Sequence, residues 1–400
     1  MSKSRARVAT LTALAGAWAA AAYFLWASTR VPDGVRLAGL AEESFFGPSF
    51  IHRAEHYEQF GYYLWLGQTV AVLVVFVLYT WRGPGFARDS AAGPIGTGML
   101  LAMLGFALVW LVSVPFTVLS LWWQRRYGQS HEGYFDVVFG GWLGLAAEFL
   151  FLSVSVLIVV GLAKWLPRAW WIPGAAAFVG LALLFTFVSP YLVADSHPLR
   201  DPELRAAAVR IADAEGVHGV PVRVQKVDTK DVNAFTTGIG SSRKVFLWSS
   251  LLDGRFSNEE IEAVLAHEYG HQARNHLLKG IAWYALFAFP GTYLIAVAVG
   301  RRGGMREPAA MPLALLVLVV LSLVALPFQN AISRHMEAEA DWMALQTTRD
   351  PDAMETFFRA LATTSLGDPS PPTVAYLAFD DHPTLMQRIA MARAWERRNG

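Results

Sequence analysis

The chain has 400 residues, of which 54% are hydrophobic and only 16% are charged. Soluble domains have roughly 45–50% apolar and about 25% charged residues, so this composition argues against a soluble globule. With 33 basic and 32 acidic residues the net charge is +1, which excludes the basic surface typical of nucleic-acid-binding proteins, and no nucleic-acid partner is expected. The absence of cysteine excludes a disulfide scaffold, a cysteine-ligated zinc site and a cysteine nucleophile.

Seven apolar windows are long enough to cross a bilayer as helices, which takes roughly 20 residues. They cover residues 8–28, 62–81, 97–122, 140–163, 170–194, 280–299 and 312–332. The first window resembles a signal peptide, but its apolar run exceeds the roughly 7–15 residues of that class, so we expect a retained span. The sequence predicts a mainly α, multi-pass helical protein of the cell membrane.

Two stretches rich in ionisable residues alternate with the apolar windows. We expect an N-terminal membrane region with five spans at 1–194, a first soluble block at 195–279, two further spans at 280–332 and a second soluble block at 333–400. The two blocks must meet in space to form one α+β domain, because two spans separate them in the chain.

The first soluble block contains recognisable secondary-structure signals. Alternating apolar residues predict strands at 221–227 and 244–248, and an amphipathic pattern predicts a helix at 203–215. Ser257 and Glu260 form a capping-box pattern, so a helix begins there and is expected to continue towards His276.

That last helix contains an H-E-x-x-H motif at His267, Glu268, Tyr269, Gly270 and His271. A spacing of four places both histidines on one helix face, where they can share a zinc ion. Glu268 projects beside them and can deprotonate a zinc-bound water, which then attacks a peptide carbonyl. The motif predicts peptide hydrolysis with one Zn²⁺ per chain.

A catalytic zinc usually has three protein ligands, so a third must come from elsewhere in the chain. The candidates are Glu337, Glu339 and Asp341, on a helical stretch that continues from the last apolar window. Glu337 and Asp341 are four apart and share a face, whereas Glu339 points elsewhere. This favours Glu337 as the ligand and Asp341 as the acceptor that orients a zinc-binding histidine. By their spacing, His276 and His335 are expected to lie outside the ligand set.

These motifs resemble those of the type I CAAX prenyl endopeptidases and their bacterial relatives, which are integral-membrane zinc metallopeptidases of the gluzincin type. The resemblance covers most of the chain. It rests on the seven windows and on residues 124–130, 266–271, 333–341 and 382–389.

The resemblance implies that His267, His271 and Glu337 bind zinc, with Glu268 as general base. It also implies that His382 stabilises the oxyanion formed at the scissile carbonyl. The segment Asn233, Ala234 and Phe235 is expected to line the cleft and to pair its backbone with an extended substrate. An edge strand with unpaired backbone groups explains such binding in physical terms.

The orientation of the chain in the membrane stays open. Basic residues in the short loops are about twice as frequent on the side of the N-terminus, which predicts a cytoplasmic N-terminus and soluble blocks on the opposite side. The resemblance instead implies a site accessible from the cytosol.

The expected function is that of an integral-membrane zinc metalloendopeptidase with a zincin-like α+β domain. It would act on membrane-associated, misfolded or CAAX-like C-terminal substrates. The alternative is a catalytically silent membrane scaffold with a structural zinc site, but such sites usually have four protein ligands and the sequence offers three. The expected partners are a peptide or protein substrate and the lipid bilayer, and the oligomeric state stays open.

Overall fold

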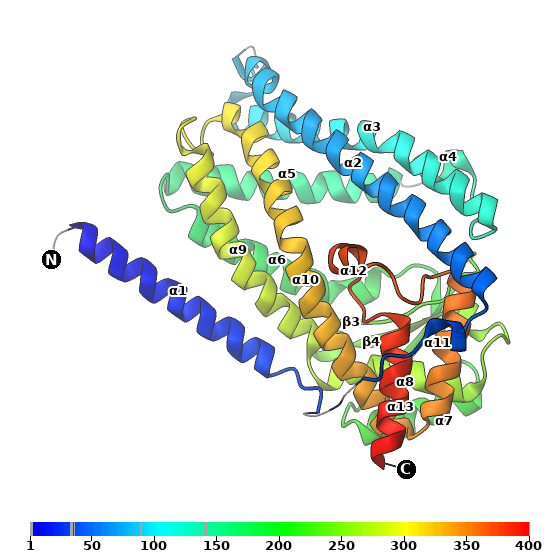
Figure 1. Cartoon of the computed structure of the whole chain (residues 1–400). Helices are drawn as coiled ribbons and strands as arrows, with labels where there is room; N and C mark the ends of the chain where they lie inside the picture. The colour runs from blue at the N-terminus through cyan, green and yellow to red at the C-terminus, as the bar shows by residue number, and fades with distance from the viewer. Residues whose placement is uncertain (1–2, 33–34, 36, 89, 140–141, 400) are drawn as a thin grey trace.

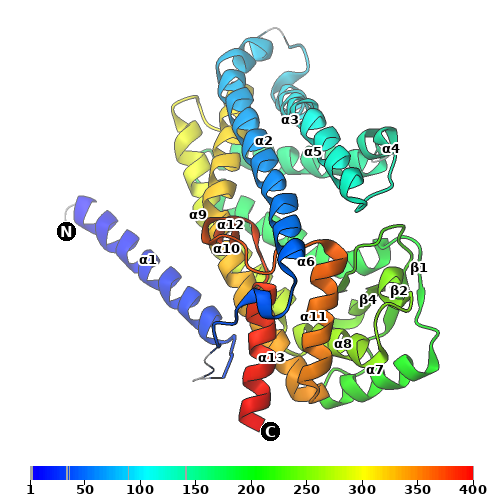
Figure 2. The same cartoon turned by 45° about the vertical axis from the view of Figure 1, so that its right-hand side comes forward.

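The computed structural model describes residues 3–32, 35, 37–88, 90–139 and 142–399. Long helices gather in one region of the molecule, and shorter helices pack with a small sheet in the other (Figure 1). The N-terminal end of helix α1 (Lys3–Ala27) points away from the other long helices in Figure 1 and in the turned view of Figure 2, and the helix contacts α9 (His276–Gly300). The Trp18 indole on α1 donates a hydrogen bond to the Leu286 carbonyl, 2.7 Å away.

Within the described residues, five helices are long and apolar enough to cross a membrane. They are α2 (Pro48–Arg88), α3 (Gly93–Tyr127), α6 (Trp171–Leu192), α9 (His276–Gly300) and α10 (Met311–Thr348). Helices α1 and α5 (Trp142–Trp165) contain shorter apolar stretches, at Thr12–Ala27 and Leu150–Trp165. Helices therefore occupy most of the described part of each of the seven predicted windows, and residues 140 and 141 of the fourth window lie outside the described residues. The prediction of a mainly helical membrane protein is confirmed.

Two of these helices reach beyond the apolar windows. Helix α2 begins at Pro48, well before its window, and in both views this first part lies beside the region of shorter helices and the sheet. Helix α10 continues without a break from the last window through the predicted acidic stretch. A single rigid helix thus joins a membrane span to Glu337.

The sheet has the strand order β1-β2-β4-β3. Its strands are β1 (Ser196–Pro198), β2 (Val222–Gln225), β3 (Ala234–Thr237) and β4 (Lys244–Trp248). Strands β2 and β4 are parallel, and the other two pairs are antiparallel. Both predicted strands are confirmed, and β3 forms one edge of the sheet.

Five shorter helices complete this region. They are α7 (Pro202–Ala214), α8 (Asn258–Ala273), α11 (Pro351–Ser365), α12 (Thr373–Phe379) and α13 (Leu385–Asn399), and a six-residue helix, α4 (Tyr134–Phe139), follows α3. Leu247 of β4, Leu265 of α8, Leu345 of α10 and Ile389 of α13 are completely buried in one apolar cluster. Residues before and after the last two spans thus share a core.

The junction between α8 and α9 differs from the expectation. The capping box at the start of α8 is present: Oγ of Ser257 accepts from the Glu260 amide, and Oε2 of Glu260 accepts from the Ser257 amide. The helix continues towards His276 as predicted but stops three residues before it. Helix α8 ends at Ala273, and Asn275 adopts a left-handed conformation with φ of 54°, which asparagine tolerates better than most residues. His276 therefore begins a new helix with a new direction.

Candidate metal centre

The two histidines of the H-E-x-x-H motif face each other one turn apart on α8. The Nε2 atoms of His267 and His271 are 3.0 Å apart. Both side chains are largely buried, with side-chain exposures of 10% and 13%. The structure thus directs two imidazole nitrogens to one point.

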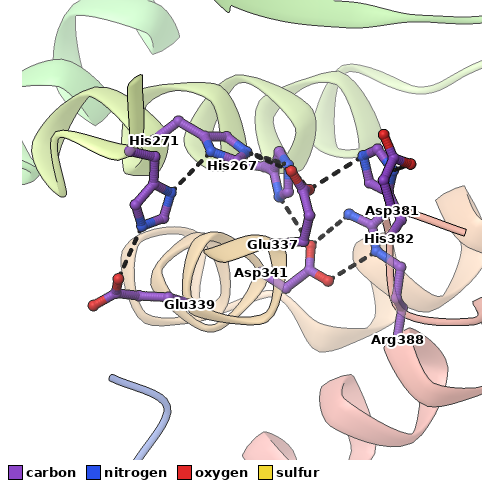
Figure 3. Close-up of polar contacts among 9 residues, drawn as sticks. His267, His271, Glu337, Glu339, Asp341, Asp381, His382 and Arg388 are labelled. Carbon is purple, nitrogen blue, oxygen red and sulfur yellow. Dashed lines mark hydrogen bonds and ion pairs between the residues drawn. The ribbon is translucent and has the colours of Figure 1, made fainter. Parts of the chain in front are cut away.

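Glu337 reaches the same point from α10. Its Oε2 lies 3.1 Å from Nε2 of His267, and its Oε1 lies 3.4 Å from Nε2 of His271. The three candidate ligand atoms all lie within 4.8 Å of one another. The close-up in Figure 3 shows these three side chains turned toward one another. Helices α8 and α10 pack against each other here, with Gly270 facing the backbone of Ala340.

These three side chains fit a zinc ion. Oε2 of Glu337 is buried and makes no hydrogen bond of good geometry in the part of the chain that the structure describes, although Nε2 of His267 and Nε2 of His382 lie 3.1 and 3.2 Å from it. A buried carboxylate oxygen without a partner is costly unless a cation or a donor occupies the position beside it. Two imidazoles and one carboxylate are also a ligand set that catalytic zinc uses, with one position left for water.

Asp341 orients one of the two histidines. Nδ1 of His267 donates a hydrogen bond to Oδ1 of Asp341 over 2.9 Å, so Nε2 of His267 keeps the lone pair that a metal requires. Arg388 of α13 holds Asp341 in turn, with Nε donating to Oδ2 at 2.8 Å and Nη2 donating to Oδ1 at 2.6 Å. Asp341 thus contacts a candidate ligand directly, whereas Glu339 points away from all three (Figure 3).

Glu268 lines a cavity of about 430 Å³ together with His267 and His382. The Glu268 side chain is buried, and burial raises the pKa of its carboxyl above the usual range. A carboxylate with a raised pKa accepts a proton more readily near neutral pH. The position and the environment of Glu268 both suit a general base.

His382 comes from the loop between α12 and α13. Its Nε2 lies 3.2 Å from Oε2 of Glu337, and its Nδ1 lies 2.7 Å from Oδ1 of Asp381. Burial alone would lower the pKa of His382, but the hydrogen bond to Asp381 and the charge of Glu337 outweigh it and raise the pKa. The structure therefore brings a hydrogen-bond donor to the edge of the candidate metal site.

Strand β3 borders the same cavity. Asn233 and Ala234 line the cavity, whereas the ring of Phe235 stacks on a ring of β4. The Trp248 amide donates to the Asn233 carbonyl over 3.0 Å, so the alternation of an antiparallel pair turns the backbone groups of Ala234 and Thr236 away from β4. Two of the three residues expected to bind substrate thus lie at the cavity.

Four residues that contact this site escaped prediction from the sequence: Arg388, Asp381, His276 and Glu339. The pairing of Arg388 with Asp341 spans 47 residues, and no local pattern indicates it. His276 and Glu339 were placed outside the ligand set, but Nδ1 of His276 lies 2.9 Å from Nδ1 of His271, and Glu339 contacts His276 in turn. Asn275 was the available signal, because asparagine is often found where a helix ends in a left-handed residue.

The chain is similar to known metalloproteases. The model of "Peptidase family M48" matches residues 198–396. The metalloprotease LoiP of Escherichia coli (strain K12) is 34% identical over 189 residues, which cover 46% of this chain and 67% of LoiP. The uncharacterized metalloprotease YhfN of Bacillus subtilis (strain 168) is 28% identical over 406 residues, which cover 94% of this chain and 92% of YhfN.

The fold is also similar to that of a solved structure. The crystal structure of S. mikatae Ste24p matches with a TM-score of 0.74 at 18% sequence identity, over 94% of this chain and 96% of that one. These matches confirm the resemblance that the motifs indicated. The chain belongs to peptidase family M48 and is a membrane zinc metalloprotease.

Proposed function

We propose that this chain is an endopeptidase of the cell membrane that hydrolyses peptide bonds within extended segments of membrane-associated or misfolded proteins, or of CAAX-like C-terminal tails. One observation carries the proposal. His267 and Glu268 of the H-E-x-x-H motif and Asn233 and Ala234 at the edge strand line the same cavity of about 430 Å³. A substrate strand can therefore lie beside the residues that perform the chemistry.

His267, His271 and Glu337 would hold the zinc ion. When bound, zinc would polarise the scissile carbonyl and lower the pKa of a water molecule. Glu268 takes one proton from that water as its oxygen adds to the carbonyl carbon. Glu268 then passes the proton to the leaving nitrogen as the C–N bond breaks, so one water is consumed for each bond cleaved.

His382 would stabilise the charge that develops on the carbonyl oxygen. Its hydrogen bond to Asp381 and its nearness to Glu337 favour the protonated ring, which donates from Nε2. A donor already held in place needs little reorganisation when the charge appears. The role assigned to His382 rests on this position.

Strand β3 would bind the substrate backbone. The outward-facing amide and carbonyl groups of Ala234 and Thr236 can pair with an extended peptide, which adds a strand to the edge of the sheet. Such pairing uses main-chain groups, so it accepts varied side chains. The continuity of α10 from a membrane span to Glu337 favours substrates that are themselves close to the bilayer.

The mechanism is tested by Glu268→Gln in the full-length protein in detergent or liposomes. Cleavage of an unfolded membrane-protein substrate should fall by at least about 10³-fold, while the zinc content stays at one ion per chain. Glu262→Gln is the matched control, because Glu262 lies on the same helix and pairs with Arg210 at the surface. Retained cleavage by the Glu268 variant would contradict the proposal.

The substrate class requires a second comparison. A farnesylated CAAX peptide and its unmodified twin should be offered alongside the unfolded substrate, and the termini of the products should be identified. Cleavage of the farnesylated peptide alone would restrict the activity to lipidated tails. If none of these substrates is cleaved while zinc is bound, the chain is a catalytically silent scaffold with a structural zinc site. A site with three protein ligands beside an open cavity argues against this alternative, because structural zinc sites usually have four protein ligands.

A further inference from the structure

The second ring nitrogen of His271 has a partner of its own. While Nε2 of His271 faces the candidate metal site, its Nδ1 lies 2.9 Å from Nδ1 of His276. The two rings meet edge to face, with centroids 4.9 Å apart. The left-handed conformation of Asn275 makes this contact possible, because it turns the first residue of α9 back onto the end of α8.

Beyond His276 lies a buried carboxylate. Nε2 of His276 is 2.9 Å from Oε2 of Glu339, and only 1% of the Glu339 side chain is exposed. Glu339 accepts two further hydrogen bonds: Oε1 from the Arg30 amide at 3.0 Å, and Oε2 from Nζ of Lys279 at 3.4 Å. With three donors directed at it, the buried carboxylate is held as an acceptor.

The direction of each hydrogen bond from Glu339 through His276 to His271 then follows. Since Glu339 accepts, the proton of His276 is on Nε2, and Nδ1 of His276 is left with a lone pair. The two Nδ1 atoms do not face the candidate metal position, as the Nε2 atoms of His267 and His271 do. Their contact of 2.9 Å therefore requires one proton, and Nδ1 of His271 must supply it. Nε2 of His271 is thereby left free to bind a metal.

A segment from the N-terminal part of the chain covers Glu339 and His276. Residues 28–30 follow α1 and lie over Glu339. Lys279 donates to the Ser28 carbonyl at 2.9 Å, and His335 contacts the Thr29 carbonyl at 3.0 Å. Thr29 is buried, so this segment helps to exclude water from the carboxylate.

We propose that His276 and Glu339 are positioning residues for the zinc ligand His271. Glu339 fixes the protonation of His276, and His276 in turn fixes the tautomer and the ring orientation of His271. Both zinc-binding histidines then have a buried carboxylate behind them: Asp341 acts directly on His267, and Glu339 acts on His271 through a second imidazole. This inference rests on the proposed zinc site and adds a function to two residues that do not bind the metal.

The main test measures the zinc dissociation constant of the full-length, detergent-solubilised protein by competition with a chromophoric chelator. His276→Phe keeps an aromatic ring of similar size but removes the acceptor for His271. Residues that support zinc ligands contribute about 10- to 100-fold to metal affinity, so the dissociation constant should rise by that factor. His335→Phe is the matched control, because His335 contacts the same 28–30 segment without touching a zinc ligand, and it should bind zinc within about twofold of the wild type.

A double variant tests whether Glu339 acts through His276. Glu339→Gln alone should weaken zinc binding, but it should weaken it no further in the His276→Phe background. His276→Asn offers an oxygen acceptor near the position of Nδ1 and should restore part of the affinity. Zinc binding by His276→Phe within twofold of the wild type, or additive effects of the two substitutions, would overturn the inference. If His276→Phe does not fold, Glu339→Gln and His276→Asn decide the same question.

These measurements are separate from the test of the proposed function. Zinc binding by a variant is scored without any substrate. If Glu268→Gln retains cleavage, the peptidase mechanism fails and the positioning role of His276 is unaffected. If His276→Phe binds zinc normally while the wild type cleaves its substrate, only the positioning role fails.

Discussion

Arg388 holds both carboxylate oxygens of Asp341, through Nε to Oδ2 at 2.8 Å and through Nη2 to Oδ1 at 2.6 Å. The carboxylate is completely buried, and its Oδ1 also accepts from Nδ1 of His267. Helix α13, near the C-terminus, thus fixes the orientation of a side chain on α8. The site depends on contacts that link distant parts of the chain, and this dependence leads to specific predictions.

Replacing Asp341 with asparagine should weaken zinc binding about 10- to 100-fold. The amide keeps one oxygen for His267 but presents an NH₂ group to Arg388, so the guanidinium loses a charged partner and the asparagine is no longer held in place. Zinc affinity measured on the folded protein checks this. Asp352→Asn, an exposed change in the first turn of α11, is the control and should have no effect on affinity.

Gly270 limits the distance between α8 and α10. A Cβ atom at this position would meet Cβ of Met343 at 3.4 Å and the backbone of Ala340 at 3.5 Å, which is ordinary contact. Gly270→Ala should therefore fold and bind zinc, with stability changed by no more than about 1 kcal/mol, because alanine also favours a helix. Gly270→Leu should force the helices apart, destabilise the fold by about 1–3 kcal/mol and lower the zinc occupancy. Thermal unfolding and metal analysis of both variants test the claim, and normal zinc binding by the leucine variant would contradict it.

Arg334 connects α10 to the loop that carries His382. Its Nη1 donates to the carbonyl oxygens of Tyr376 and Asp380, and its guanidinium lies 4.3 Å from the Tyr376 ring centroid. Arg334→Met should let this loop move, so kcat should fall about 10- to 100-fold while the zinc dissociation constant stays unchanged. Arg397→Met, at an exposed position near the C-terminus, is the control. A parallel loss of zinc would show that Arg334 supports the metal site rather than His382.

Local signals in the sequence were sufficient for most elements of the fold. Apolar windows located the membrane helices, and the capping box at Ser257 and Glu260 located the start of α8. The spacing of the motif residues indicated that His267, His271 and Glu337 could converge, because a helix repeats every 3.6 residues whatever surrounds it. Asp341 was assigned a partner on the same basis.

Features that depend on distant contacts could not be predicted in this way. The edge position of β3 follows from the strand order β1-β2-β4-β3, which no single strand specifies. The contact of His276 with His271 depends on one left-handed residue, Asn275, that ends α8 without glycine or proline. The place of His382 was available only from the resemblance to a known family, because the loop that carries it is held by Arg334 of another helix.

Glu215 provides a prediction on pH. This residue ends α7, and its Oε1 accepts a hydrogen bond from Thr347 at 3.0 Å. Its Oε2 is buried without a hydrogen-bond partner among the described residues. Burial raises the pKa of Glu215 from 4.5 to about 7, against the opposing effects of Thr347, His267 and Arg274. The folded protein thus favours the protonated carboxyl.

The sign of the effect on stability follows from this rise. Below pH 4.5 the side chain is protonated in both the folded and the unfolded chain, and its stabilising contribution is fully present. As the pH rises through about 7, the folded protein must ionise a carboxyl that the unfolded chain has already ionised, and this contribution is lost. The pKa difference corresponds to at most about 3 kcal/mol, and partial exposure to solvent reduces this value.

Glu215→Gln removes the ionisable group and should therefore stabilise the protein at pH 8 relative to the wild type. The advantage should shrink as the pH falls and vanish near pH 4.5, where the wild-type side chain is neutral as well. Thermal unfolding of both proteins in detergent between pH 4 and 8 gives the difference in stability between the variant and the wild type. The contributions of all other ionisable groups cancel in this difference, because both proteins contain them. Glu262→Gln, which removes a carboxyl on the surface of α8, is the matched control. A Glu215→Gln variant that is less stable than the wild type at pH 8 would show that the buried carboxylate is compensated by partners in the folded protein, and the raised pKa would be wrong.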